Sequence, residues 1–473
     1  MRLPGFVGPS YQMDALQFDC QRTVNYYPLI SETQTSKSGG ALRSIPGYTL
    51  FSTAGGGSIR GMKTTTSNGR GWVVSGYELY EVNTNGTSTL RGTLLTGSGR
   101  VGMAENGTQL MVVDGTYGYI YNMNTDVFAQ ITDSDFPMCN NVDFQDGYFL
   151  VTQKNTPNFY ISDLYDGLVW DPLDFARADT SPDNLVGLIS DHGNVWLFGT
   201  SSVEIWQNTG ALAFPFANIP GAVVQTGCAA WATICKFDNT LIWLGFDQQG
   251  RGIVWKANGY SAQRVSTQAI ESKIADVTDL TNAYAYVYHE QGHIFYCLQL
   301  GGLDSTLVFD GATSSWHERS YYDTTLDQMQ PHRGSGQMFF NGMNLIGDDR
   351  SGAIYEQDLG IFTFNSEYMY RDRIYPHLQE EKAVIPYHSV EIDMQVGVGL
   401  NSGQGSDPMM MMRYSDDGGM TWSYWRTAPV GKIGKYKNRA RFARCGSARD
   451  RVFHFRYTEP TFAQLNDCYI NAT

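Results

Sequence analysis

Two histidines four residues apart form the first group in this sequence that could carry out chemistry. The run His289-Glu290-Gln291-Gly292-His293 matches the pattern H-E-x-x-H, in which a helix holds both imidazoles against one zinc ion. A helix is not expected here, because residues 284–288 and 294–298 are rich in the aromatic and β-branched residues typical of strands, and Gly292 suits a turn. We therefore interpret the run as the tip of a β-hairpin, and we expect no bound metal.

A second motif lies near the C-terminus and has the pattern S-x-D-x-G-x-T-W, the Asp-box of sialidases and related propellers. In this pattern the serine and aspartate brace a turn, glycines adopt positive φ angles, and the tryptophan packs beneath the hairpin. None of these roles is catalytic, so the motif predicts a structural element. Its residues are Ser415, Asp417, Gly419, Thr421 and Trp422.

Neither these motifs nor the rest of the chain predicts an enzyme. A glycosidase needs two carboxylates on either side of a sugar-binding cleft, and a sialidase adds a tyrosine nucleophile and an arginine cluster. The chain has 47 Asp and Glu residues, so a pair of carboxylates alone proves little, and no arginine cluster can be nominated. A P-loop, a G-x-S-x-G elbow and a Cys/His dyad spacing are also missing. We expect no catalytic residue and no cofactor.

A basic stretch surrounds and follows the Asp-box. From Arg413 to Arg456 the chain has 11 Lys/Arg against 3 Asp/Glu, a formal charge of +8, so the remainder of this chain of net charge −14 carries −22. The basic residues alternate with apolar ones, which suggests strands with one charged face. This face either binds a partner, such as DNA phosphates or an acidic neighbouring subunit, or pairs with the acidic body of its own chain. The candidate interaction residues are Lys432, Lys435, Lys437, Arg439, Arg441 and Arg444.

The elements that must position these residues are predicted to be β-strands throughout. Turn dipeptides recur between alternating segments, which is a strong signal for hairpins. They are Asn85-Gly86, Asn106-Gly107, Asp146-Gly147, Asn258-Gly259, Asp310-Gly311 and Asn341-Gly342.

A repeat becomes visible when the strands are aligned on their aromatic residues. Seven strand-like segments end at Tyr80, Tyr121, Tyr160, Trp206, Trp255, Phe309 and Tyr355, at intervals of 39 to 54 positions. A module of this length with about four short strands is typical of a β-propeller blade. The sequence thus predicts an all-β protein with a propeller of about seven blades, with six as the alternative count.

Composition shifts divide the chain into three parts. Residues 1–57 are expected to form an N-terminal arm or closing segment, residues 58–376 the β-propeller, and residues 377–473 a C-terminal β module that holds the Asp-box hairpin and the basic face. The seven scattered cysteines suggest free thiols in a reducing compartment. The sequence shows neither a signal peptide nor an apolar stretch that could span a bilayer, so we expect synthesis in the cytosol without membrane anchoring.

Several stretches, taken together and in order, resemble the tail hub (packaged-DNA stabilisation) proteins of short-tailed bacteriophages. The N-terminal stretches are Val24-Asn25-Tyr26-Tyr27-Pro28 and Leu42-Arg43-Ser44-Ile45-Pro46-Gly47. The central ones are residues 264–271, 292–296, 306–310 and 316–319, and the C-terminal one is residues 413–453. No single piece is specific, but their order extends over nearly the whole chain.

The resemblance implies a structural virion protein of the phage tail. Such hubs, or nozzles, form a ring, expected here to be a hexamer, below the portal and its adaptor (the head-to-tail connector). The ring retains packaged DNA, forms part of the DNA ejection duct, and carries tailspikes or fibres and a needle or plug. DNA would pass through the lumen without sequence-specific binding, and for that reason we favour a protein partner for the basic face.

Two alternatives from other classes remain open at this point. One is a sialidase-like enzyme, and the other is a carbohydrate-binding propeller that acts in host adsorption. The resemblance implies a location in the virion tail after assembly in the host cytoplasm.

Overall fold

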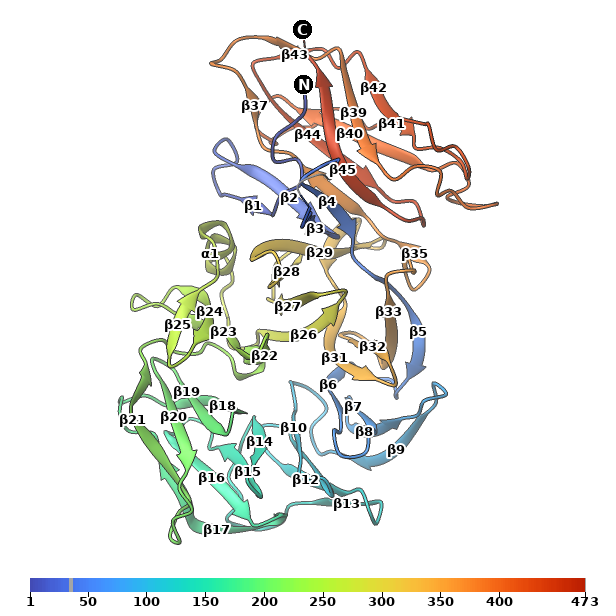
Figure 1. Ribbon diagram of the computed structural model, residues 1–473. Coiled ribbons are helices and arrows are strands. Elements are labelled where there is room, and N and C mark those ends of the chain that lie inside the picture. Colours follow the sequence, from blue (N-terminus) through green and yellow to red (C-terminus); the bar gives the residue numbers. More distant parts are fainter. Residues whose placement is uncertain (34–36, 473) are drawn as a thin grey trace.

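The computed structural model describes residues 1–33 and 37–472, and nearly all of its regular elements are β-strands. Within these residues, seven four-stranded blades surround a central axis, and a sandwich of two sheets packs beside the propeller (Figure 1). The all-β propeller prediction is confirmed, and the blade count is seven rather than six.

Each of the first six blades is built from four consecutive antiparallel strands. The first two are β6 (Ile59–Thr64), β7 (Gly71–Ser75), β8 (Glu78–Val82), β9 (Ser88–Thr93) and β10 (Gly102–Glu105), β11 (Gln109–Val113), β12 (Gly118–Asn122), β13 (Val127–Gln130). The third and fourth are β14 (Val142–Gln145), β15 (Tyr148–Thr152), β16 (Asn158–Asp163), β17 (Asp166–Arg177) and β18 (Leu185–Asp191), β19 (Asn194–Gly199), β20 (Val203–Asn208), β21 (Phe216–Val224). The fifth and sixth are β22 (Cys235–Phe237), β23 (Thr240–Phe246), β24 (Gly252–Asn258), β25 (Ser261–Arg264) and β26 (Tyr284–Glu290), β27 (His293–Gln299), β28 (Thr306–Asp310), β29 (Ser315–Asp323).

The seventh blade joins the two ends of the propeller. Its first three strands are β31 (Gly334–Phe340), β32 (Met343–Asp348) and β33 (Ala353–Asp358), and its fourth is β5 (Gly47–Thr53) from the N-terminal segment. Strand β5 pairs antiparallel with β33 along its length, from Ala353↔Thr53 to Asp358↔Gly47. The ring of blades is therefore closed by hydrogen bonds between strands about 300 positions apart in the sequence.

The predicted turns and aromatic strands take equivalent places in the blades. All six turn dipeptides connect consecutive strands of one blade, and in the turns Asp146-Gly147 and Asn341-Gly342 both residues have positive φ. The seven aromatic segments correspond to β8, β12, β16, β20, β24, β28 and β33, which is the third strand of each blade. The sequence period thus reports the blade repeat directly.

Burial between neighbouring blades explains why the repeats must stack. Each of the seven neighbouring pairs of blades shares one cluster of buried apolar residues. Between the first two blades, for example, Trp72 and Val74 pack with Leu110 and Val112. A single blade would expose both of its faces, so the stability of each blade depends on its neighbours.

The β-sandwich takes strands from both ends of the chain. One sheet has the order β3 (Tyr26–Ile30), β4 (Gly40–Ser44), β45 (Gln464–Asn471), β39 (Ser389–Met394), β42 (Ala440–Ala443). The other has the order β2 (Cys20–Val24), β36 (Arg371–Ile374), β44 (Asp450–Tyr457), β40 (Met409–Ser415), β41 (Arg426–Pro429). A single parallel bridge, Val24↔Glu318, connects β2 to β29 of the sixth blade.

Short elements complete the fold. They are β1 (Tyr11–Gln12), β30 (Gln328–Pro331), β34 (Thr363–Phe364), β35 (Glu367–Tyr368), β37 (Leu378–Gln379), β38 (Ile385–Pro386), β43 (Ser447–Ala448), the 3₁₀ turn η1 (Trp231–Thr233) and the helix α1 (Gln268–Ala275). Among the described residues, no helix has the length and apolar character needed to cross a membrane.

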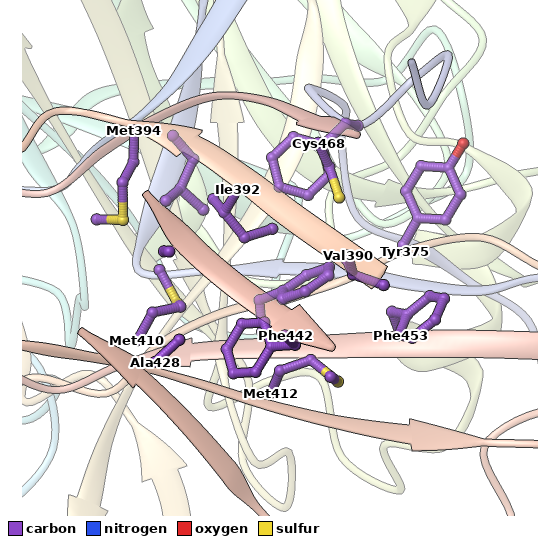
Figure 2. Packing of buried hydrophobic residues seen from close by; sticks show 14 of the residues in the cluster. Tyr375, Val390, Ile392, Met394, Met410, Met412, Ala428, Phe442, Phe453 and Cys468 are labelled. Carbon is purple, nitrogen blue, oxygen red and sulfur yellow. The ribbon is translucent and has the colours of Figure 1, made fainter. Parts of the chain in front are cut away.

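The core of the sandwich lies between its two sheets. Side chains of β39 and β42, such as Val390 and Phe442, meet Met412 and Phe453 from β40 and β44 (Figure 2). Tyr26 and Leu42 of the N-terminal strands belong to the same cluster. The segment expected to be an arm or closing segment therefore contributes to the core of the sandwich as well as to the propeller, and β36 joins the sandwich from before residue 377.

Candidate functional site

The histidine pair lies at a hairpin tip, as predicted. Strands β26 and β27 pair Glu290 with His293, and the turn residues Gln291 and Gly292 have φ angles of 47° and 82°. Because side chains alternate between the faces of a sheet, His289 and His293 point to opposite faces. His293 is buried, with Nδ1 2.8 Å from the carboxylate of Asp310, whereas His289 is exposed. This geometry cannot direct both imidazoles at one ion, and the described residues hold no cluster of three or more potential metal ligands.

The Asp-box forms a turn braced by its own side chains. Ser415 Oγ donates to Asp417 Oδ1 over 2.6 Å and accepts from the Gly419 N–H over 2.8 Å, and the Thr421 N–H donates to Asp417 over 2.8 Å. Gly418 and Gly419 have φ angles of 77° and 97°. The bonds from Ser415 and Thr421 lower the pKa of Asp417 to about 2. The stability that the ionised Asp417 contributes to the turn is therefore fully present at a pH above the ordinary carboxyl pKa, and it is lost only as the pH falls toward 2.

Trp422 differs from the expectation for an Asp-box tryptophan, because it is half-buried and does not enter the sandwich core. The guanidinium of Arg413 lies 4.7 Å from the ring of Trp422 and 4.5 Å from that of Trp425. Arg456 continues the stack, 5.0 Å from Trp425 and 4.9 Å from Tyr370. The Asp-box therefore holds Trp422 at the end of a ladder of alternating rings and guanidinium groups on the surface of the second sheet.

We predict that Trp422→Ala lowers the free energy of unfolding by about 1–2 kcal/mol, because the change removes one cation–π contact and half-buried ring area. A fully buried tryptophan would cost about 3–5 kcal/mol. Thermal and denaturant unfolding of the purified protein measures the difference. Tyr424→Ala is the control because Tyr424 is exposed, and equal effects of the two changes would contradict the ladder.

The six candidate basic residues are all exposed. Only Arg441 lies in a strand, β42; Lys432, Lys435, Lys437 and Arg439 belong to the preceding loop, and Arg444 follows β42 with a φ angle of 57°. The expectation of a charged strand face is therefore wrong for most of the stretch. The loop begins after the close turn at Gly431 and contains Gly434, both with positive φ, so a regular strand cannot continue through it.

The ion pairs of this basic surface are made within the sandwich. Lys432 lies 3.6 Å from Asp407, and Arg439 lies 3.7 Å from Glu391. Lys432, Asp407 and Arg439 are exposed and Glu391 is half-buried, and pairs at the surface contribute little to stability. Within the part of the chain that the structure describes, the other four basic residues have no ion-pair partner, and none of the six pairs with the propeller.

Two arginines of the basic stretch form ion pairs within the sandwich, and the sequence alone did not distinguish them from the exposed basic residues. Arg451 is only 2% exposed, and its Nε and Nη2 donate to the Asp416 carboxylate over 2.6 and 2.7 Å. Arg456 forms the same two-bond arrangement with Asp372, at 2.7 Å for each bond. Burial opposes the ionisation of Asp372, but Arg456 and His454 outweigh it and hold its pKa well below the usual range. A signal in the sequence is that both arginines lie within the apolar run of β44.

The axis of the propeller contains a cavity of about 800 Å³ lined by the ends of the inner strands. One of its charged groups, Arg60, has a structural role. Arg60 donates to the carbonyl oxygens of Gly99, Gly76, Thr96 and Ser98 over 2.6–2.8 Å.

Two carboxylates line the same cavity. Asp114 accepts from Thr96 Oγ1 over 2.7 Å and from the Tyr117 N–H over 2.7 Å, so it braces a turn. Burial and the neighbouring Asp348 raise the pKa of Asp349 to about 6. The cavity therefore presents one carboxylate engaged in a turn and one whose pKa is raised by burial and by a neighbouring carboxylate.

Comparison with known families accounts for almost the entire chain. The family description "Bacteriophage P22 Gp10, beta-propeller" matches residues 1–361, and "Bacteriophage P22 Gp10, beta-sandwich" matches residues 370–473. The chain belongs to the P22 Gp10 family. The resemblance to phage tail hub proteins seen in the sequence is thereby confirmed. In this Gp10-family protein, strands β2, β3 and β4 fall in the part matched as propeller, although they pair within the sandwich.

A curated relative of this Gp10-family chain is the tail hub protein gp10 of Salmonella phage P22. The two are 27% identical over 274 residues, which cover 54% of this chain and 56% of the relative. The chain thus matches little more than half the length of that relative. Solved structures with a similar arrangement include the N-terminal domain of Nup159 (10% identity, TM-score 0.41, 71% of this chain and 99% of that one). The WD40 domain of Neurospora crassa Pan2 is also similar (10% identity, TM-score 0.41, 64% and 89%).

One surface of the Gp10-family chain was missed by sequence reasoning. Strand β17, at the outer edge of the third blade, exposes Leu168, Val169 and Leu173 among aspartates. The signal in the sequence is the run Asp166–Arg177, in which apolar and acidic residues follow one another without regular alternation.

Proposed function

We propose that this protein is a structural component of a phage tail, a hub or nozzle that forms a ring below the portal adaptor. The observation that carries the proposal is the match of both Gp10 family domains, in order, over residues 1–361 and 370–473. The P22 relative is itself described as a tail hub protein. In this role the ring retains packaged DNA and forms part of the duct through which DNA is ejected.

A closed ring follows from the task of sealing a duct around one DNA molecule. Only closed rotational symmetry surrounds the duct without a gap, and each subunit then uses two different surfaces against its two neighbours. We propose a hexamer. The portal adaptor, a tailspike or fibre, and a needle or plug are the further partners, and DNA crosses the lumen without sequence-specific contacts.

We propose that the protein acts without catalysis. The motif that resembles a zinc site places its histidines on opposite faces of a hairpin, and the Asp-box carboxylate is used to brace a turn. In the axial cavity, Asp114 is occupied by hydrogen bonds from Thr96 and from the backbone. The protein is assembled in the host cytoplasm and resides in the tail of the virion.

Deletion of the gene from the phage that encodes it tests the proposed function. Particles without this protein are expected to package DNA, fail to complete their tails and lose the genome, because the pressure of packaged DNA is no longer retained. Electron microscopy and DNA content of purified particles measure both effects, and supply of the protein from a plasmid is the control. Stable, full and infectious particles would contradict the proposal. Full, stable particles that fail to adsorb to cells would instead favour a carbohydrate-binding role.

A further inference from the structure

We propose that neighbouring copies in the ring contact each other through the basic loop of one β-sandwich and the acidic, apolar edge of the third blade in the next copy. The basic loop is defined as residues 432–439, and the acidic edge as β17 together with Asp163, the last residue of β16. The inference rests on the proposed ring, and it names the two different surfaces that such a ring requires.

The acidic edge protrudes from the propeller. Strand β17 is the outer strand of its blade, and its pairing with β16 shifts between Tyr160↔Phe175 and Ser162↔Trp170. Four residues of β17, Asp171 to Asp174, therefore face a single residue of β16 and bulge outward. Leu173 within this bulge is 79% exposed.

The carboxylates of this edge lack cationic partners. Asp163 and Asp171 accept hydrogen bonds from backbone N–H groups, and Asp166 accepts from a backbone N–H group and from Gln109. Among the described residues, no Lys or Arg forms an ion pair with these three carboxylates or with Asp174. Burial, together with Asp171 and Asp163, raises the pKa of Asp174. Negative charge at this edge is thus uncompensated within the subunit, and a cation from a neighbour would relieve the repulsion.

Protection of an exposed edge explains only part of these features. Charges, proline and a bulge are common means to prevent edge strands from pairing with other chains. Exposed apolar side chains work against that purpose, yet Leu168, Val169 and Leu173 are all exposed here. The fourth blade has a similar bulge in β21, with Pro220 but without carboxylates, between Glu204↔Val223 and Trp206↔Asn218. The combination of apolar and acidic side chains is therefore a property of the third blade and not of the bulge.

The basic loop offers the complementary chemistry. Ile433 and Tyr436 are 57% and 70% exposed, and they alternate with the exposed Lys432, Lys435 and Lys437. The apolar side chains of the basic loop can thus pack on those of the acidic edge, while the surrounding lysines face the carboxylates. Such a contact would bury apolar surface and pair opposite charges.

The position of the two surfaces favours contact between copies. Strand β17 lies at the end of the propeller far from the sandwich, whereas the basic loop precedes β42 in the sandwich (Figure 1). One subunit therefore cannot bring its own two surfaces together. A head-to-tail contact uses each surface once in every subunit, as a closed ring demands.

Charge reversal on one surface at a time tests the inference. The variants are Asp171→Lys with Asp174→Lys, and Lys435→Glu with Lys437→Glu. Each variant protein is added alone to particles from the gene-deleted phage, and incorporation is measured by quantifying the protein in purified particles. We expect each to lose at least tenfold in incorporation, because like charges then face each other at every contact.

A mixture of the two variants provides the decisive arm. In an alternating ring of the two variants, contacts between the reversed edge and the reversed loop alternate with contacts between the two unchanged surfaces. Opposite charges then face each other at every contact, so a ring with an even number of subunits should assemble. Incorporation is expected to return to within threefold of wild type, with equal amounts of the two variants. A matched control for the edge variant, Asp276→Lys with Glu380→Lys, makes the same charge change at exposed positions elsewhere and should incorporate normally.

Crosslinking keeps the test valid if a charge variant folds poorly, as judged by its melting curve. Leu173→Cys with Tyr436→Cys in one chain should give a ladder of covalent oligomers in assembled tails with a bismaleimide, since six of the seven native cysteines are buried. Normal incorporation of both charge variants, a mixture no better than each variant alone, or rings without the ladder would overturn the contact and leave the proposed hub intact. Tails in which the wild-type protein forms no ring would overturn both.

Discussion

Replacement of Arg373 by methionine is expected to unfold the junction between the N-terminus and the β-sandwich. Arg373 lies on β36 and is fully buried. Its guanidinium donates to the carbonyl oxygens of Phe6, Pro9 and Gly5 over 2.9, 3.1 and 3.0 Å. It also donates to Thr23 Oγ1 over 2.9 Å. Burial lowers the pKa of Arg373 to about 10, so the group remains protonated at neutral pH.

The expected cost of this change is at least ~3 kcal/mol of unfolding free energy, because several buried acceptors lose their donor at once and each orphaned group costs about 1–3 kcal/mol. Methionine has a similar length, so the loss of unfolding free energy comes from the missing hydrogen bonds and not from a cavity. Denaturant unfolding and proteolysis near residues 5–9 measure the effect. Arg439→Met is the control because Arg439 is exposed, and it should change stability by less than about 0.5 kcal/mol. Equal stability of the two variants would show that the N-terminal residues are held by other contacts.

Replacement of Tyr48 by alanine is expected to open the closure of the propeller. Tyr48 lies on β5, the strand that completes the seventh blade, and its buried ring packs 4.6 Å from Tyr355 and 4.8 Å from Phe364. Truncation of a buried aromatic residue costs about 3–5 kcal/mol. Since β5 carries the hydrogen bonds that join the ends of the ring of blades, the loss should appear as earlier cleavage of the segment around β5 by protease and as a lower melting temperature.

Leu50→Ala is the matched control for Tyr48→Ala. Leu50 lies on the same strand but is 52% exposed, so its truncation should leave the melting temperature nearly unchanged. A smaller effect for Tyr48 than for Leu50 would mean that the closure does not depend on the cluster around Tyr48. In assembled tails, the Tyr48 variant is expected to reduce incorporation because a propeller with an open seventh blade also exposes the edge of β33.

The candidate surfaces show where sequence reasoning succeeds and where it ends. The hairpin at Gln291-Gly292 and the Asp-box turn at Ser415 were predictable because each depends on a few adjacent residues and their backbone preferences. The environment of Trp422 was not predictable, because the motif does not show that the ring packs on Arg413 of β40 and stays outside the sandwich core. Likewise, the charge count could not separate the buried Arg451 from the exposed Lys435.

The sequence by itself determined most of the strands, their turns and the blade repeat. Alternation and turn residues act over fewer than about ten residues within each hairpin, and the aromatic third strand recurs along the chain once in every blade. Only the tertiary structure decided where the N-terminal segment belongs: β2, β3 and β4 enter the sandwich, and β5 closes the propeller. Strands such as β5 and β33 carry no local signal for each other. Their pairing depends on which sheet edges and apolar faces remain uncovered after all seven blades have stacked, and on buried groups such as Arg373 that fix the distant ends of the chain together.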